Sequence, residues 1–112
     1  MDDPDAPMGV FVHWVVYNIN PKTKEVLENS VPKNAVLGMT NFGKAGYGGP
    51  CPPPASPEQL QRGESGSHRY FFKLYALDVT LDLKNPNKAE VEAEMKDHII
   101  DRAELIGLYS RN

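Results

Sequence analysis

Apolar positions in this chain fall into separate stretches, and each stretch has its own spacing. Residues 10–19 read VFVHWVVYNI and are apolar at odd and even positions alike, which predicts a strand covered on both faces. Residues 68–83 read HRYFFKLYALDVTLDL and give the longest strand signal, with many aromatic residues. We expect this second strand to lie beside the first strand in one sheet.

The carboxyl-terminal part of the chain changes from strand spacing to helical spacing and back. Val91, Met95 and Ile99 recur at every fourth position, and Asn87 with Glu90 three residues later is typical of a capping box at a helix start. Residues 103–111 alternate again and predict a final strand that closes the sheet. The pattern as a whole predicts a mainly β domain with one short helix near its carboxyl terminus.

Glycine and proline separate these stretches. The chain has 10 prolines and 9 glycines, which indicates many turns. Residues 38–49 read GMTNFGKAGYGG and predict a loop able to form one wall of a ligand site. The following PCPPP predicts a stiff extended segment. Residues 58–67 read EQLQRGESGS, lack apolar anchors, and predict a mobile surface excursion.

Length, charge and cysteine content narrow the functional classes. A chain of 112 residues is sufficient for one domain with a single modest core, so we expect residues 1–112 to form one domain. A formal net charge of −3 argues against nucleic acid or an anionic membrane surface as partner. The apolar runs are much shorter than the roughly 20 residues of a transmembrane helix. One cysteine and no leader pattern favour a soluble cytoplasmic protein without membrane insertion.

The first candidate for chemistry is DPDAP, at residues 3–7. Pro4 and Pro7 fix their own φ and keep the residues before them extended, so the carboxylates of Asp3 and Asp5 are held in advance. A rigid aspartate commonly accepts N–H groups that lock a loop, or it holds the ring of a histidine. The sequence by itself leaves both roles open.

Two histidines and a tyrosine are the next candidates. His13 lies within an apolar strand, His68 opens the second strand, and the strand period of two places Tyr70 on the same side as His68. A single histidine among apolar residues is usually a buried structural group. Two such histidines, together with a proline-braced aspartate and a glycine-rich loop, favour a functional site.

Four motifs, DPDAP, HWVVYNI, GYGGPCPP and HRYFFKLYALD, follow one another in this order. Through these four motifs and their order, nearly the whole chain resembles the phosphatidylethanolamine-binding protein family, which includes the Raf kinase inhibitor protein. The resemblance implies a β-sandwich with a small pocket for phosphate-type anions, phosphorylated small molecules or phospholipid head groups. We expect no cofactor, and no metal because the three histidines lack paired ligand spacing. The pocket residues that the resemblance implies are Asp3, Asp5, His13, Gly49, Pro50, His68 and Tyr70.

The chain departs from the family pattern at three places, one of which is the carboxyl-terminal helix of longer eukaryotic members, which has no counterpart after Tyr109. The family has strands ahead of DPDAP that this chain does not carry, and an uncovered sheet edge tends to recruit another chain, so a homodimer is one expectation. Alternatively, the start is internal to a longer reading frame. Residues 55–67 replace a short glycine-containing link, and this insertion could be a lid, a loop for a partner or a disordered spacer.

Three functions compete. The first is a non-enzymatic binding or regulatory protein whose acids keep the neighbouring imidazoles available as cationic donors to an anion. Relatives in the family have been linked to inhibition of kinases or serine proteases, which implies such a protein as partner. The second is an enzyme using His and Asp, which is disfavoured because GESGS lacks the last glycine of G-x-S-x-G and prolines flank Cys51. The third is a structural protein with a vestigial pocket.

Overall fold

The structure is a computed structural model that describes residues 1–111. Its elements, in chain order, are β1 (Asp2–Asp3), β2 (Phe11–Val12), β3 (Val16–Tyr17), β4 (Val36–Leu37), α1 (Pro57–Gln61), β5 (His68–Leu77), α2 (Lys88–Met95) and β6 (Ile99–Tyr109). Four strands form an antiparallel sheet in the order β2-β1-β5-β6, and β3 pairs with β4 in a second sheet. The predicted mainly β fold, with a short helix near the carboxyl terminus, is confirmed.

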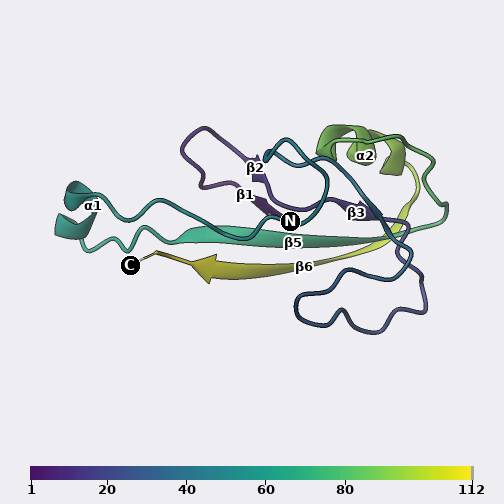
Figure 1. Cartoon of the computed structure of the whole chain (residues 1–112), viewed down its shortest axis with the longest axis horizontal. Coiled ribbons are helices and arrows are strands. Elements are labelled where there is room, and N and C mark those ends of the chain that lie inside the picture. Colours follow the sequence, from purple (N-terminus) through teal and green to yellow (C-terminus); the bar gives the residue numbers. More distant parts are fainter. Residues whose placement is uncertain (112) are drawn as a thin grey trace.

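The hairpin of β5 and β6 runs along the long axis of the molecule (Figure 1). The two strands pair from His68 opposite Tyr109 to Leu77 opposite Ile99, and one extra residue in β6 shifts the register between Ala76 and Leu77. Successive side chains of β5 point to opposite faces of the sheet. One face therefore carries His68 and Tyr70, and the other face carries Arg69, Phe71 and Tyr75.

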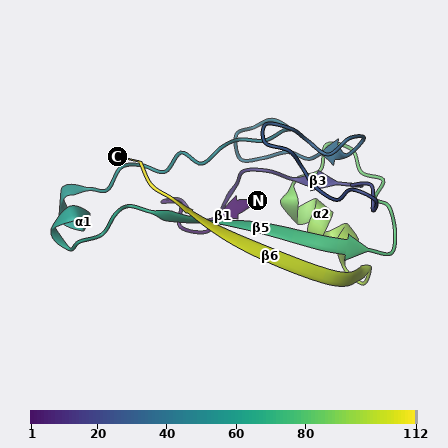
Figure 2. The same ribbon diagram turned by 90° about the horizontal axis from the view of Figure 1, so that it is seen from below.

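The core lies on the face of β5 that carries Tyr75. Buried Val15, Tyr17, Leu81, Val91 and Met95 form it, with Tyr75 and Leu77 among the partly buried residues packed against it. Figure 2 shows α2 between the β5–β6 hairpin and the layer that contains β3. Val91 and Met95 are the buried residues of α2, and the capping box between Asn87 and Glu90 is present. The helix start and the spacing of Val91 and Met95 are thus confirmed, whereas Ile99, the third residue of the predicted helical spacing, begins β6.

The first apolar stretch does not form the single strand that its pattern predicted. It is divided into β2 and β3, because the backbone between them turns toward the amino terminus: the N–H groups of His13 and Trp14 both donate to the carbonyl of Met1, at 2.9 and 3.2 Å. The expected adjacency of the two long apolar stretches is also wrong. The two residues of β1 lie between β2 and β5, with Asp2 opposite both Val12 and Phe71.

The second long stretch ends as a strand at Leu77, earlier than residue 83. Beyond that point the backbone bonds to a side chain in place of a neighbouring strand. Asn18 accepts from the N–H of Leu81 at 2.8 Å and donates to the carbonyl of the same residue at 2.7 Å. This amide therefore completes the hydrogen bonding that a strand partner would otherwise provide.

Residues 55–67 contain a helix that the sequence analysis did not predict. Ser56 and Gln59 form a capping box at the start of α1, and Pro57 occupies the first turn, where a proline is tolerated. No residue of α1 is buried, and the helix lies at the opposite end of the molecule from α2 (Figure 1). The capping box was a local signal of a helix start, but the low apolar content of the segment led to the prediction of a surface excursion.

Among residues 1–111, no helix is long and apolar enough to cross a lipid bilayer.

Replacing Met95 by alanine tests the packing of α2. The side chain is 8% exposed within the core cluster, so Met95→Ala should lower the free energy of unfolding by about 2–4 kcal/mol. Urea denaturation followed by circular dichroism measures the change. The neighbouring exposed Glu94 provides the control, because Glu94→Ala should change the stability by no more than about 0.5 kcal/mol. Equal losses in the two variants would contradict the orientation of the helix.

Candidate functional site

The candidate site begins with a buried pair of ionisable side chains, Asp3 and His68. They are 3% and 9% exposed, and Oδ2 of Asp3 lies 2.6 Å from Nδ1 of His68. The other oxygen, Oδ1, accepts the backbone N–H of Asp5 at 2.8 Å. One carboxylate therefore locks the proline-braced turn and also orients the ring of a histidine. Both roles that the sequence left open are present in the same residue.

Tyr70 lies on the same face of β5 as His68, and only 2% of its surface is exposed. Its Oη has no hydrogen-bond partner among residues 1–111, although buried polar groups in proteins are normally paired. Burial, together with the nearby charge of Asp3, raises the pKa of Tyr70 to about 12. The phenol therefore remains neutral at physiological pH and keeps its O–H group as an unused donor in the site.

His13 brings a second imidazole to Tyr70 from the segment after β2. It is 4% exposed, and its ring meets the ring of Tyr70 edge to face, with a centroid distance of 5.4 Å. Nδ1 lies 2.9 Å from the carbonyl oxygen of Gly48, which can only accept, so this nitrogen carries the proton. The Nε2 atom is left available.

The glycine-rich loop is attached to this histidine at both backbone and side chain. In addition to the bond to the ring, the N–H of Gly48 donates to the carbonyl of His13 at 3.0 Å. A Cβ at position 48 would lie 1.9 Å from the ring of Phe42, so a larger residue there would require this ring to move. The exposed Gly49 and the half-buried Pro50 follow directly. They follow the residue that is bonded to His13, and their expected role as a wall of the site stays a prediction.

Asp5 takes the first of the two roles that the sequence left open, because it accepts a backbone N–H group. It does not contact an imidazole: its carboxylate accepts Nε and Nη2 of Arg69, at 2.9 and 2.8 Å, and also the backbone N–H of that residue at 2.9 Å. These bonds hold the pKa of Asp5 at about 2. The sequence analysis missed Arg69. Arg69 lies between His68 and Tyr70 in the sequence, so strand alternation predicts that its side chain points to the face of β5 opposite theirs. This position was the available signal that Arg69 lies next to the site.

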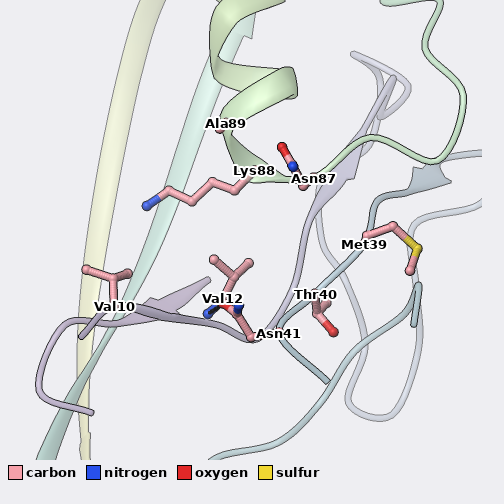
Figure 3. Close-up of a pocket in the computed structure, with 8 residues that line it drawn as sticks. All are labelled: Val10, Val12, Met39, Thr40, Asn41, Asn87, Lys88 and Ala89. Carbon is pink, nitrogen blue, oxygen red and sulfur yellow. Dashed lines mark hydrogen bonds between the residues drawn. The ribbon is translucent and has the colours of Figure 1, made fainter. Parts of the chain in front are cut away.

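Two cavities lie on the face of the sheet opposite His68 and Tyr70. The larger cavity has a volume of about 310 Å³ and is lined by the start of α2 and by side chains around β2. Figure 3 shows Lys88 extending from the helix toward the strands. The smaller, about 200 Å³, includes Asp2, whose carboxylate lies 2.7 Å from the amine of Lys88 and 3.2 Å from that of Lys73. Neither cavity is lined by Asp3, His13, His68 or Tyr70.

Other candidate residues lie outside the cluster. Cys51 is exposed, and its Sγ accepts from Nη1 of Arg111 at 3.3 Å. His98 follows α2 and lies 2.8 Å from the carboxylate of Asp78. Within residues 1–111, no group of three or more His, Cys, Asp or Glu side chains is arranged to hold a metal ion.

The pairing of Asp5 with Arg69 should make stability depend on pH. The folded-state pKa of about 2 lies below the ordinary 3.8, so the pair stabilises the fold above about pH 4 and this contribution is lost as pH falls toward 2. Asp5→Asn should lower the free energy of unfolding at neutral pH by about 1 kcal/mol. Urea titrations from neutral pH to acid should show this difference shrink below pH 4. The exposed Asp82 is the control, and a loss for Asp5→Asn that is independent of pH would contradict the ion pair.

Comparison with solved structures supports a common fold. The chain is similar to the crystal structure of a phosphatidylethanolamine-binding protein homologue from Chlamydia trachomatis, with a TM-score of 0.84 and 37% identity over 99% of this chain and 69% of that one. It is also similar to the Escherichia coli protein YbcL, a member of the mammalian family of this name, with a TM-score of 0.77 and 30% identity over 99% of this chain and 68% of that one.

Sequence comparison gives the same result. The chain is 44% identical to a UPF0098 protein of Pyrococcus horikoshii and 48% identical to one of Aquifex aeolicus, and these matches span 99% and 100% of it. They cover only 55% and 64% of the two relatives, so this chain spans little more than half the length of the first. The model of the family described as phosphatidylethanolamine-binding protein matches residues 1–110. The chain belongs to the phosphatidylethanolamine-binding protein family.

Proposed function

We propose that this protein is a non-enzymatic binding protein, and that the cluster of Asp3, His13, His68 and Tyr70 takes up a phosphate-type anion. The observation that carries this proposal is the buried Oη of Tyr70, which has no partner. Leaving a buried polar group unpaired costs about 1–3 kcal/mol. An anionic oxygen placed at Oη would accept this hydrogen bond, and the cost of leaving the group unpaired would disappear on binding.

The other donors to the anion come from the two histidines. The Nδ1 atoms are occupied by Asp3 and by the carbonyl of Gly48, so each ring can donate through Nε2 in its protonated form. The carboxylate of Asp3 orients the ring of His68 but repels an anion. Bare phosphate should therefore bind weakly.

An apolar substituent on the ligand should strengthen binding. The ring of His13 lies 4.9 Å from that of Phe11 and 5.4 Å from that of Phe42, measured between centroids. Phe42 is 43% exposed, so an apolar group next to the phosphate would gain contact with this aromatic edge. The ligand class supported best is a phosphorylated small molecule or lipid head group that carries carbon beside its phosphate.

The arrangement favours binding over acyl transfer. The Nδ1 atoms of both site histidines are bonded to oxygen acceptors, and within residues 1–111 neither ring forms a hydrogen bond to a serine or cysteine that could act as nucleophile. Cys51 is bonded to Arg111 on the surface. Turnover of a phosphate ester or acyl ester by the wild-type protein would contradict the proposed lack of catalysis.

The exposed helix α1 favours an additional regulatory role. Leu60 is 62% exposed on a capped helix that has no buried residue, and surface loops often carry binding residues, so we propose this leucine as the contact for a kinase or serine protease. Inhibition of a serine protease or kinase by the wild-type protein, lost in Leu60→Asp, would support this role. Inhibition that Leu60→Asp leaves unchanged would contradict a contact through α1.

Removing the Tyr70 hydroxyl separates binding from stability. Tyr70→Phe should raise the dissociation constant for phosphate and phosphoethanolamine about three- to tenfold, because one hydrogen bond is lost. It should leave the unfolding free energy unchanged or higher, since no protein bond to Oη is broken. Titrations followed by the NMR signals of His13 and His68 measure the affinity. Tyr75→Phe, on the opposite face of β5, is the matched control and should bind as wild type.

Neutralising Asp3 tests its support of His68. Asp3→Asn keeps an oxygen acceptor for the ring but removes the negative charge, so phosphate affinity should fall about five- to tenfold. The same NMR titration, with phosphate, phosphoethanolamine and a short-chain phospholipid in separate arms, distinguishes the ligand sources. Affinity equal to or above that of the wild type would show that repulsion by the carboxylate outweighs its support of the histidine.

A further inference from the structure

Arg111 is a permanent cation just beyond the face that carries the candidate site. Tyr109 lies opposite His68 in the β5–β6 hairpin. Arg111 follows two residues later, about 7 Å further along an extended chain, where alternation keeps it on the side of Tyr109. The chain leaves β6 at the end of the hairpin where α1 lies (Figure 1), so the exposed Arg111 is located next to the His68 end of the site.

The guanidinium of Arg111 is held by a weak acceptor. Its Nη1 donates to Sγ of Cys51 at 3.3 Å, and within residues 1–111 this arginine takes part in no salt bridge. A thiol sulfur accepts only weakly, whereas a carboxylate or phosphate oxygen accepts strongly from a guanidinium and often takes two parallel bonds. An acidic group that reaches Arg111 will therefore displace the sulfur.

Cys51 connects this cation with the site. It follows three residues after Gly48, whose carbonyl and N–H are both bonded to His13. Burial is the main cause of the raised pKa of Tyr70, and the charges of Asp3 and then of Cys51 add to it, so the sulfur lies near the phenol. The segment of residues 48–51 thus has His13 at one end and Arg111 at the other.

Neither β5 nor β6, both fully described, supplies a lysine or arginine to the face of His68 and Tyr70. The register places the following residues on this face: His68, Tyr70, Phe72, Leu74 and Ala76 of β5, and Asp101, Ala103, Leu105, Gly107 and Tyr109 of β6. The basic residues of the two strands lie on the opposite face: Arg69, Lys73 and Arg102. An imidazole is cationic only when it is protonated, so a permanent positive charge reaches this end of the site through Arg111.

We propose that Arg111 binds a second acidic group of the ligand, so that the site prefers a phosphorylated compound that also carries a carboxylate. This inference rests on the proposed uptake of phosphate and deepens it. The phosphate lies at Oη of Tyr70 and at the imidazoles, and the carboxylate takes the place of the Cys51 sulfur at the guanidinium. Phosphoserine and phosphoethanolamine are the matched probes, because phosphoserine differs only by one added carboxylate.

Calorimetric titration with these two compounds tests the inference. The wild type should bind phosphoserine about five- to tenfold more tightly than phosphoethanolamine, and in Arg111→Gln the two affinities should become equal to within about twofold. The NMR signal of the Nε–H group of Arg111 should shift with phosphoserine but not with phosphoethanolamine. Circular dichroism checks that each variant folds.

Arg102→Gln is the matched control, because it removes the same charge from an exposed position on the opposite face of β6. It should keep the preference for phosphoserine. An equal loss of preference in Arg102→Gln would show an effect of overall charge and would overturn the inference. A preference that Arg111→Gln retains would overturn it as well.

Two further outcomes separate this inference from the proposed function. If the wild type binds both compounds equally and Tyr70→Phe weakens both, the role of Arg111 is refuted and the phosphate site stands. If the wild type binds neither compound, both are refuted.

The same comparison with short-chain phosphatidylserine and phosphatidylethanolamine distinguishes a lipid head group from a free phosphorylated compound. A preference within either pair that Arg111→Gln removes supports the inference, and the pair that binds more tightly identifies the source of the ligand.

Discussion

The 2.6 Å contact between the carboxylate of Asp3 and the imidazole of His68 is the interaction on which the arrangement of this molecule depends. It joins a strand of only two residues to the long β5–β6 hairpin, at a position where both groups are largely buried. Asp2 reaches Lys73 and Lys88 on one face of the sheet, and Asp3 reaches His68 on the other. The acidic turn is thus attached to the hairpin on both sides.

A buried ionisable pair is a poor means of stabilising a fold. Removing two charged groups from water costs nearly as much as their attraction returns, and apolar residues of similar volume often stabilise equally well. The nearby hydroxyl of Tyr70 adds a further cost because no protein atom of the described chain accepts its hydrogen bond. These two costly features lie side by side, and they are the basis of the anion binding proposed above.

The β5–β6 hairpin contributes to the site through both of its strands. Its inner strand carries His68 and Tyr70, while its outer strand leads through Tyr109 to Arg111. The register of the hairpin fixes Tyr109 opposite His68, so the phosphate cluster and the proposed carboxylate contact cannot move independently.

Local spacing within the sequence was sufficient for several elements. The four-residue recurrence of Val91 and Met95, with the cap at Asn87, determined α2, because helix geometry and capping depend on neighbours within one or two turns. Alternation determined which residues of β5 share a face. The motif resemblance grouped Asp3, His13, His68 and Tyr70, and the structure brings these four residues together.

Tertiary structure alone decided the remaining contacts. That Asp5 binds Arg69 and not an imidazole, that β1 separates β2 from β5, and that Tyr70 has no partner all depend on which distant segments meet. Proline can fix the direction of a short turn, but it carries no information about the strand that will lie opposite. The sequence by itself thus determined the local conformation and the face of the strand on which each side chain lies. The pairing of segments about 65 residues apart, such as Asp3 with His68, was decided only when the chain folded, because hydrogen-bond partners across a sheet are set by register.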